Sequence, residues 1–227
     1  MDEHDKKVQA AENAKHKLTE KEKQRLAAFA VIEEELMKRG YTRNDLTISL
    51  TKANVVGLLL VLPIMAVLCI VFLIVNGLAP ITDLMESNRL WAGLSLVIAG
   101  LSIVPLALVH EGIHGICWGM GAKNHMKDIE YGFIKEMLTP YCYCRSPLSK
   151  GMYLFGSMMP MTVLGIVVCI LGVIFASPCL MVVGLIQIMG GSGDILVSSM
   201  LLRHKTKGKD AVLMDHPTEC GLIVFEK

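Results

Sequence analysis

The chain has 227 residues, of which 53% are hydrophobic and 19% charged, and its formal net charge is +1. This balance provides no basic stripe that could neutralise a phosphate backbone, so we expect no nucleic-acid partner. The charges are unevenly distributed. Residues 1–53 carry 11 of the 22 basic and 10 of the 21 acidic side chains, whereas residues 151–202 carry only Asp194. The sequence therefore predicts a polar segment attached to membrane-spanning helices.

The polar segment, residues 1–53, is predicted to be cytosolic and to contain one amphipathic helix. The helix is expected to begin at Thr19, which can form a capping box with Glu22. Apolar side chains between Leu26 and Leu36 form one stripe, and Gly40 is a natural stop. Such a stripe packs on other cytosolic parts or lies on the membrane surface.

Four apolar runs exceed the length of about 18 residues that marks a membrane span. They cover residues 54–75, 90–119, 152–176 and 179–202. Lys and Arg side chains gather before the first run, in the segment 121–150 and in the tail 203–227. Because positively charged loops stay in the cytosol, both termini and the 121–150 segment are predicted to be cytosolic.

The segment between the second and third spans carries a strand pattern. Ile129, Tyr131 and Phe133 alternate with small or polar residues, and two tyrosines alternate with Cys142 and Cys144 further on. The sequence thus predicts an all-α membrane protein. Its parts are an N-terminal cytosolic helix, four transmembrane helices within 54–202, a small β-hairpin within 121–150 and a cytosolic tail.

The second span contains an HExxH motif, His110-Glu111-Gly112-Ile113-His114. Residues four apart share one helix face, so both imidazoles can bind one metal ion, and Glu111 lies at the adjoining edge. There it can take a proton from a metal-activated water. An acid at mid-membrane costs on the order of 2.5–3.5 kcal/mol, which makes such a group functional by default. The alternative is a structural cluster of hydrogen-bonded polar side chains.

Asp194 is the candidate third ligand, because a catalytic zinc ion usually has three protein ligands and one water. At 1.5 Å per residue, His114 lies about 8–13 Å and Asp194 about 13 Å from the cytosolic ends of their helices. The two residues therefore share one membrane level. Glycines at 190, 191 and 193 loosen the helix, and such backbone lines a cavity or is buried. Alternatively, Asp194 is a cap or a counter-ion for a protonated histidine.

The remaining histidines and cysteines are weaker candidates. Cys117 shares the face of the two histidines but is interpreted as a packing residue. The lone histidines His125, His204 and His216 are interpreted as solvated. The chain has seven cysteines, and this odd number does not indicate a disulfide framework.

The HEGIH motif in one span and the Gly193-Asp194 pair in a later one resemble the putative zincin peptidases, bacterial membrane metalloproteases similar to the site-2 proteases. The resemblance covers about residues 40–227, including TPYCYCRSPL and DHPTECG. It implies zinc as the cofactor, His110, His114 and Asp194 as its ligands, Glu111 as the catalytic base, and a bacterial plasma membrane. Site-2 proteases place the ligand in Leu-Asp-Gly, whereas this chain has Ser-Gly-Asp-Ile.

The predicted function is zinc-dependent hydrolysis of peptide bonds in a membrane or membrane-associated protein near the cytosolic face. Glu111 would pass a proton from the attacking water to the leaving amine. An extended substrate could pair with the strand at residues 129–133, or the hairpin could merely cover the site. Two alternatives stay open: a catalytically silent metal-binding scaffold or immunity-type protein, and a small cation-handling transporter.

Overall fold

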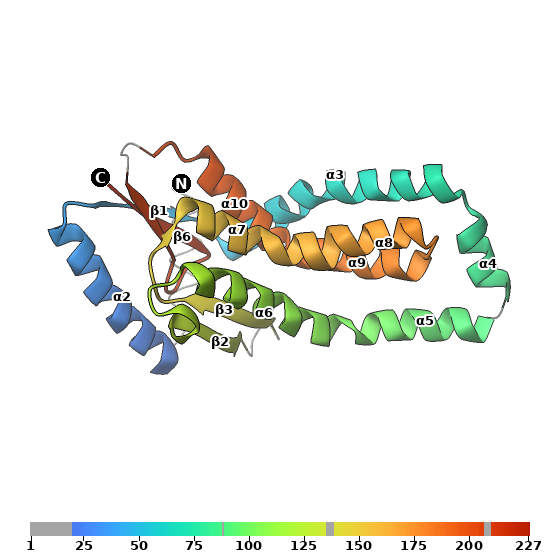
Figure 1. Cartoon of the computed structure of the whole chain (residues 1–227), viewed down its shortest axis with the longest axis horizontal. Coiled ribbons are helices and arrows are strands. Elements are labelled where there is room, and N and C mark those ends of the chain that lie inside the picture. Colours follow the sequence, from blue (N-terminus) through green and yellow to red (C-terminus); the bar gives the residue numbers. More distant parts are fainter. Residues whose placement is uncertain (1–19, 88, 135–138, 207–209) are drawn as a thin grey trace.

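The computed structural model describes residues 20–87, 89–134, 139–206 and 210–227. The helices are α2 (Glu20–Lys38), α3 (Leu50–Asn76), α4 (Ala79–Ser87), α5 (Arg89–Leu101), α6 (Ile103–Gly121), α7 (Lys150–Pro160), α8 (Val168–Ile174), α9 (Pro178–Gly190) and α10 (Ser192–Arg203). The strands are β1 (Thr42–Thr47), β2 (Ile129–Ile134), β3 (Thr139–Cys144), β4 (Leu148–Ser149), β5 (Ala211–Asp215) and β6 (Gly221–Glu226). Figure 1 shows the long helices side by side, with all strands and α2 at one end and α4 at the other.

Three described helical stretches are long and apolar enough to cross a membrane, and a bent pair is a candidate for a fourth. They are Leu50–Asn76, Gly93–Gly121, Lys150–Ile174 and the pair Pro178–Gly190 with Ser192–Arg203. These stretches coincide with the four predicted spans. The two halves of the last one are bent by 49°, at the glycines that are predicted to loosen this helix.

Small residues and a change of helix type set the packing of the apolar helices. A Cβ atom on Gly184 would lie 2.8 Å from the Gly165 carbonyl oxygen, so α9 closely approaches the helical stretch that contains Gly165. A Cβ atom on Gly57 would lie equally close to the Ser192 carbonyl oxygen, next to the bend. After Pro160 the chain continues as a π-helix, Met161–Val167, before α8 begins. This irregular stretch follows Pro160, and π-helical turns are frequent at functional sites.

The sequence analysis missed a four-stranded antiparallel sheet, whose order is β1-β6-β5-β4. β1 pairs with β6 from Thr42 opposite Glu226 to Thr47 opposite Gly221. The predicted C-terminal tail, 203–227, therefore supplies two of the four strands. The prediction of an all-α protein with one hairpin is wrong here. β1 finds its partner far away in the sequence and β4 is only two residues long. The neighbouring strands β5 and β6 carry no alternation of apolar and polar residues that would indicate their pairing.

The predicted β-hairpin is present as β2 and β3, paired antiparallel with Tyr131 opposite Cys142. The hairpin packs against the face of α6 that carries Gly115 and Gly119. A Cβ atom on Gly115 would overlap the Tyr131 hydroxyl at 1.9 Å, and one on Gly119 would meet the Met126 sulfur at 2.6 Å. The close approach that these glycines allow is therefore used by the hairpin and the turn before it.

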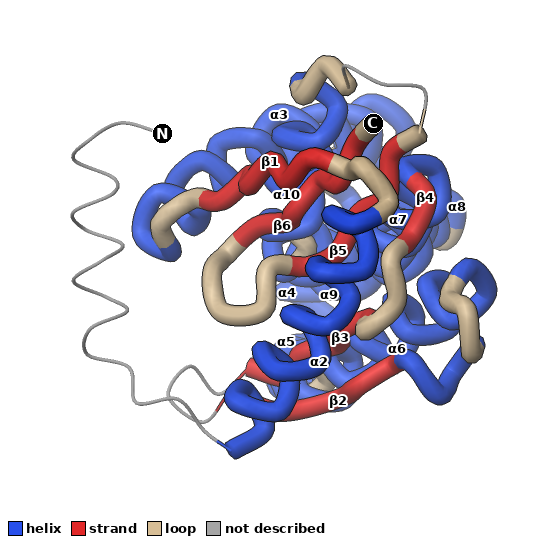
Figure 2. The backbone as a smooth tube through the Cα atoms, turned by 90° about the vertical axis from the view of Figure 1, so that its left-hand side faces the viewer, coloured by secondary structure: helices blue, strands red, loops and turns tan. Residues whose placement is uncertain are grey.

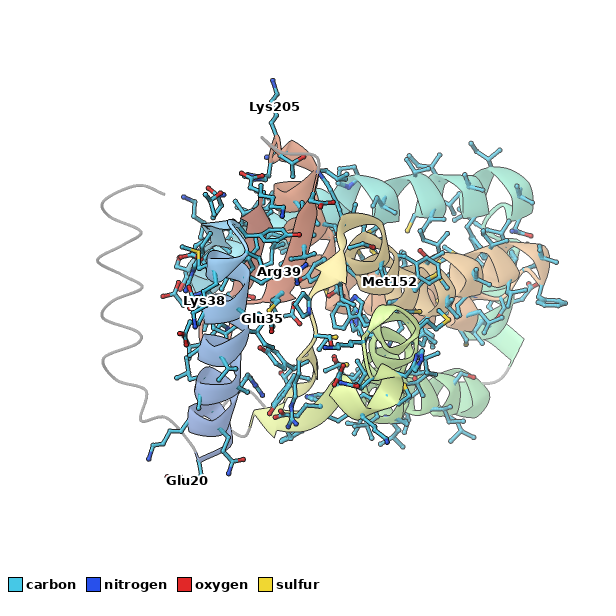
Figure 3. The ribbon with its side chains drawn as sticks, turned by 60° about the vertical axis from the view of Figure 1, so that its left-hand side comes forward. Glu20, Glu35, Lys38, Arg39, Met152 and Lys205 are labelled. Carbon is cyan, nitrogen blue, oxygen red and sulfur yellow. The ribbon has the colours of Figure 1, made fainter. Side chains whose placement is uncertain are left out.

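Helix α2 packs on the sheet, which confirms the predicted packing role of its apolar stripe. Phe29 and Leu36 are buried against Phe225 of β6 and its neighbours. In Figure 2, which looks at this end of the molecule, α2 passes in front of β5 and the hairpin. Glu20 lies at one end of the helix and Lys38 at the other (Figure 3). The predicted capping box depends on residue 19, which lies outside the described residues.

Candidate metal centre

The structure brings together the three predicted metal ligands. His110 and His114 lie on α6, and Asp194 lies in the first turn of α10. The Nε2 atom of His110 is 3.1 Å from Oδ2 of Asp194, and the Nε2 atom of His114 is 3.4 Å from Oδ1. One potential ligand atom from each residue lies within 4.8 Å of the other two. The imidazoles are 9% and 3% exposed and the carboxylate 24%, so the group can be approached from the side of Asp194.

This donor set fits the zinc ion that the resemblance implies. Two imidazole nitrogens and one carboxylate are a common set of protein ligands for catalytic zinc. Bonds of about 2.0–2.1 Å place neighbouring ligand atoms of a tetrahedral site roughly 3.3 Å apart. Each imidazole nitrogen has one Asp194 oxygen near that separation, at 3.1 Å (Oδ2) and 3.4 Å (Oδ1). Three protein ligands leave the fourth position for water or substrate.

Helix α7 fixes the orientation of His114. The Nδ1 atom donates a hydrogen bond of 2.9 Å to the Gly156 carbonyl oxygen, so Nε2 is the nitrogen that faces Asp194 and that would bind a metal ion. Trp118 stacks on the imidazole with ring centroids 4.8 Å apart, and its own N–H donates to the Tyr153 carbonyl oxygen. A Cβ atom on Gly156 would lie 2.1 Å from Trp118, so only glycine leaves room for this stack.

Two buried serines and a helix bend position Asp194. The Ser157 hydroxyl donates to the Asp194 carbonyl oxygen at 3.3 Å, and the Ser198 hydroxyl donates to Ser157 at 3.1 Å. The bend between α9 and α10 falls at Gly191, where a Cβ atom would lie 3.1 Å from Met161. The predicted loosening of the helix before Asp194 is therefore present, and it turns this side chain toward α6.

Glu111 lies beside the ligands in the wall of a cavity of about 240 Å³. The backbone of Cys142, in β3, forms a hydrogen bond with its carboxylate. The cavity also reaches Tyr141 in β3 and Asp215 in β5. The helices thus provide the ligands and Glu111, and the strands provide the opposite wall.

Sequence reasoning missed the residues that hold these groups in place. Gly156 and Ser157 look like ordinary packing residues of an apolar span, and Trp118 and Tyr153 like core aromatics. Asp215 is the first residue of the DHPTECG segment. Its position next to a histidine is the one sequence signal that could have marked it as a candidate site residue.

The weaker candidates lie apart from the three ligands. Cys117 is buried but belongs neither to the metal-ligand group nor to the cavity wall. His125 is exposed, as predicted, with Nδ1 3.2 Å from a backbone carbonyl oxygen. The prediction of solvated side chains is wrong for His204 and His216. These are partly buried and contact Glu226 and backbone N–H groups, respectively. All seven cysteines are free thiols.

Comparison with known proteins identifies the segment that holds the site. A family model described as "Putative zincin peptidase" matches residues 103–208, from the start of α6 to just beyond α10. Searches of curated proteins and of solved structures found no match. The matched segment contains Glu111 and all three potential ligands. The resemblance to the putative zincin peptidases is confirmed over residues 103–208, a shorter stretch than the expected 40–227, and DHPTECG lies outside this match.

Proposed function

We propose that the protein is a zinc-dependent intramembrane metallopeptidase that hydrolyses peptide bonds of membrane or membrane-associated proteins. The observation that carries this proposal is the convergence of His110, His114 and Asp194 from two apolar helices, with Glu111 beside them at a cavity. The family description supports peptidase chemistry. The apolar helices around the site support its location within a membrane.

The side chains divide the chemistry between them. A bound zinc ion would supply a Lewis acid that polarises the scissile carbonyl and acidifies the attacking water. Glu111 accepts the proton of that water and later donates it to the leaving amine. The Cys142 backbone keeps the Glu111 carboxylate at the cavity. The hydrogen bond from His114 to Gly156 holds the imidazole in one tautomer throughout.

The placement of Lys and Arg side chains supports a cytosolic location for the end that carries α2 and the strands. Both described ends of the chain lie there (Figure 1). His114 is seven residues before the end of α6, about 10 Å along the helix axis. The scissile bond would therefore lie within the membrane near its cytosolic face, and by the family resemblance this membrane is a bacterial plasma membrane.

A transmembrane substrate has to unwind before it is cut, because a helix engages its own carbonyl groups in hydrogen bonds. The hairpin of β2 and β3 is a two-stranded sheet, and β3 contributes to the cavity wall. A strand at the edge of a sheet can pair with an extended peptide. We propose that the unwound substrate lies along this hairpin while its scissile bond reaches Glu111.

The experiment is to purify the protein in detergent and to measure its zinc content and its cleavage of a panel of tagged single-span membrane proteins. Glu111→Gln should retain zinc and lose about 10²–10⁴-fold in cleavage rate. Glu86→Gln, the same change at an exposed position of α4, should behave like the wild type. Equal cleavage by Glu111→Gln and the wild type would contradict the proposal. Zinc without cleavage of any panel member would support the silent-scaffold alternative instead.

A further inference from the structure

One acidic side chain of the cavity has no part in the chemistry proposed above. Asp215, the last residue of β5, lies in the wall of the cavity that contains Glu111 and the metal ligands. It is close enough to His114 and to Cys142 for electrostatic interaction with both. The carboxylate therefore belongs to the same chamber, although it comes from the sheet and not from an apolar helix.

No ion pair neutralises the charge of Asp215 among the described residues, although the more distant charges of His114 and Arg25 act on it. The Tyr153 hydroxyl donates a hydrogen bond of 2.5 Å to Oδ1, and the backbone of Cys144 contributes another. Within the described part of the chain, no Lys, Arg or His nitrogen forms an ion pair with this carboxylate. Burial raises the pKa of Asp215, and the hydrogen bond from Tyr153 opposes that effect. A carboxylate held in place but unpaired is stabilised by an incoming positive charge.

The charge balance of the cavity also favours the binding of a positively charged group. Three acidic residues line it, namely Glu111, Asp194 and Asp215, and no Lys or Arg is among the lining residues. A divalent ion at the metal centre offsets two of the three negative charges. The charge of Asp215, the acidic residue outside the metal centre, then favours a cationic group, because charge interactions at a partly buried site are stronger than in bulk solvent.

We propose that Asp215 forms a subsite that binds the side chain of a Lys or Arg near the scissile bond of the substrate, with Tyr153 as its positioning residue. This inference rests on the proposed peptidase function. It also agrees with the proposed orientation, because transmembrane segments carry Lys and Arg at their cytosolic ends. A substrate drawn into the cavity from that side would bring such a residue with it.

Binding of peptides to a protein that does not cleave them tests the subsite separately from the peptidase activity. The probe is a set of N-acetylated fluorescent peptides with Lys, Met or Glu placed in turn at each position around the centre. The acetyl group excludes binding through a terminal ammonium. Zinc-loaded Glu111→Gln protein should bind the Lys peptide at least about tenfold more tightly than the Met peptide at one position.

Asp215→Asn, added to Glu111→Gln, should reduce that preference to less than about threefold, and Asp215→Lys should favour the Glu peptide. Asp210→Asn is the matched control, because it removes an exposed acid from the residue preceding β5. It should keep the preference for Lys. Zinc content and the thermal transition show whether each variant is folded.

Two results would overturn the subsite. The first is that the Glu111→Gln protein, in which Asp215 is unchanged, shows no preference for the Lys peptide. The second is that folded Asp215→Asn protein keeps the preference. Failure of the peptidase proposal has a different signature. If wild-type protein cleaves none of the peptides but the Lys preference appears and Asp215→Asn removes it, the cationic subsite stands without the peptidase. If wild-type protein cleaves the Lys and Met peptides equally and binds them equally, only the subsite is wrong.

Discussion

The apolar helices and the strand-bearing end contribute to one cavity in different ways. Helices α6 and α10 supply Glu111 and the three potential ligands, and α7 supplies the hydrogen bonds that orient them. Strands β3 and β5 supply the facing wall, including Asp215. The proposed metal ligands and the proposed substrate subsite thus come from different parts of the molecule, and we expect substitutions to alter them separately.

The largest expected effect is the loss of a ligand from the helical part. His114→Ala removes one of two imidazoles, so zinc affinity should fall by more than about a hundredfold and cleavage should fall with it. The strand pairing far from α6 should persist. His125→Ala, at an exposed position just beyond the same helix, should retain zinc. Zinc titration with a competing chelator measures both variants, and wild-type affinity in His114→Ala would contradict the assignment.

A smaller effect is expected from the support provided by α7. In Gly156→Ala the new Cβ would lie 2.1 Å from Trp118, which must move away from the His114 imidazole. Loss of this support should weaken zinc binding about 10–100-fold. Gly151→Ala lies on the same helix, where a Cβ meets no atom within 4 Å, and should leave zinc affinity unchanged. If the two alanine variants bind zinc equally well, the stack on His114 has no positioning role.

The smallest effect on the metal centre is expected from the strand-bearing end. Arg25 of α2 forms an ion pair of 3.0 Å with Glu130 of β2, and both side chains are 11% exposed. Burial alone would raise the pKa of Glu130, but hydrogen bonds from Arg145 and Arg25 hold it below its ordinary value. Glu130→Gln should destabilise the docking of α2 by about 1.5–3 kcal/mol at pH 7 and leave zinc affinity unchanged.

The sign of the pH dependence follows from the lowered pKa of Glu130. Its contribution is fully present above the unfolded value of about 4.3 and is lost as the pH falls through the folded value. The difference in amide exchange of α2 between wild type and Glu130→Gln should therefore persist from pH 7 to 5 and shrink below about pH 4. Glu34→Gln, which removes an exposed pair with Lys38, is the control. A difference that grows on acidification would contradict the account.

The helical part could be predicted from the sequence because its signals are local. Apolar runs define the spans, and ionisable groups among apolar residues mark the site, so His110, Glu111 and His114 stand out directly. Asp194 follows from its depth in the membrane. The residues that orient these groups could not be found in this way, since the Gly156 carbonyl acts through its backbone and carries no signal in the side chain.

The sheet could not be predicted as a whole, because β1 and β4 pair with strands that lie far away in the sequence. β1 reads TRNDLT, a mostly polar sequence with no alternation of apolar residues, and its partner β6 lies about 180 positions later. β6 has an unbroken apolar run, and such a run does not distinguish a strand from a buried helix. β5 and β6 are also neighbours in the sequence, but they lack the alternation of residue types by which the hairpin of β2 and β3 could be predicted.

The most direct measurement is the zinc content of purified wild-type and Asp194→Asn protein, with Asp83→Asn, an exposed position of α4, as control. The contacts of Asp194 with the two imidazoles would also suit a counter-ion for protonated histidine, and the two roles differ in metal binding. The account predicts stoichiometric zinc in the wild type and in Asp83→Asn, and little in Asp194→Asn. A wild-type protein without zinc, or Asp194→Asn with undiminished zinc, would contradict it.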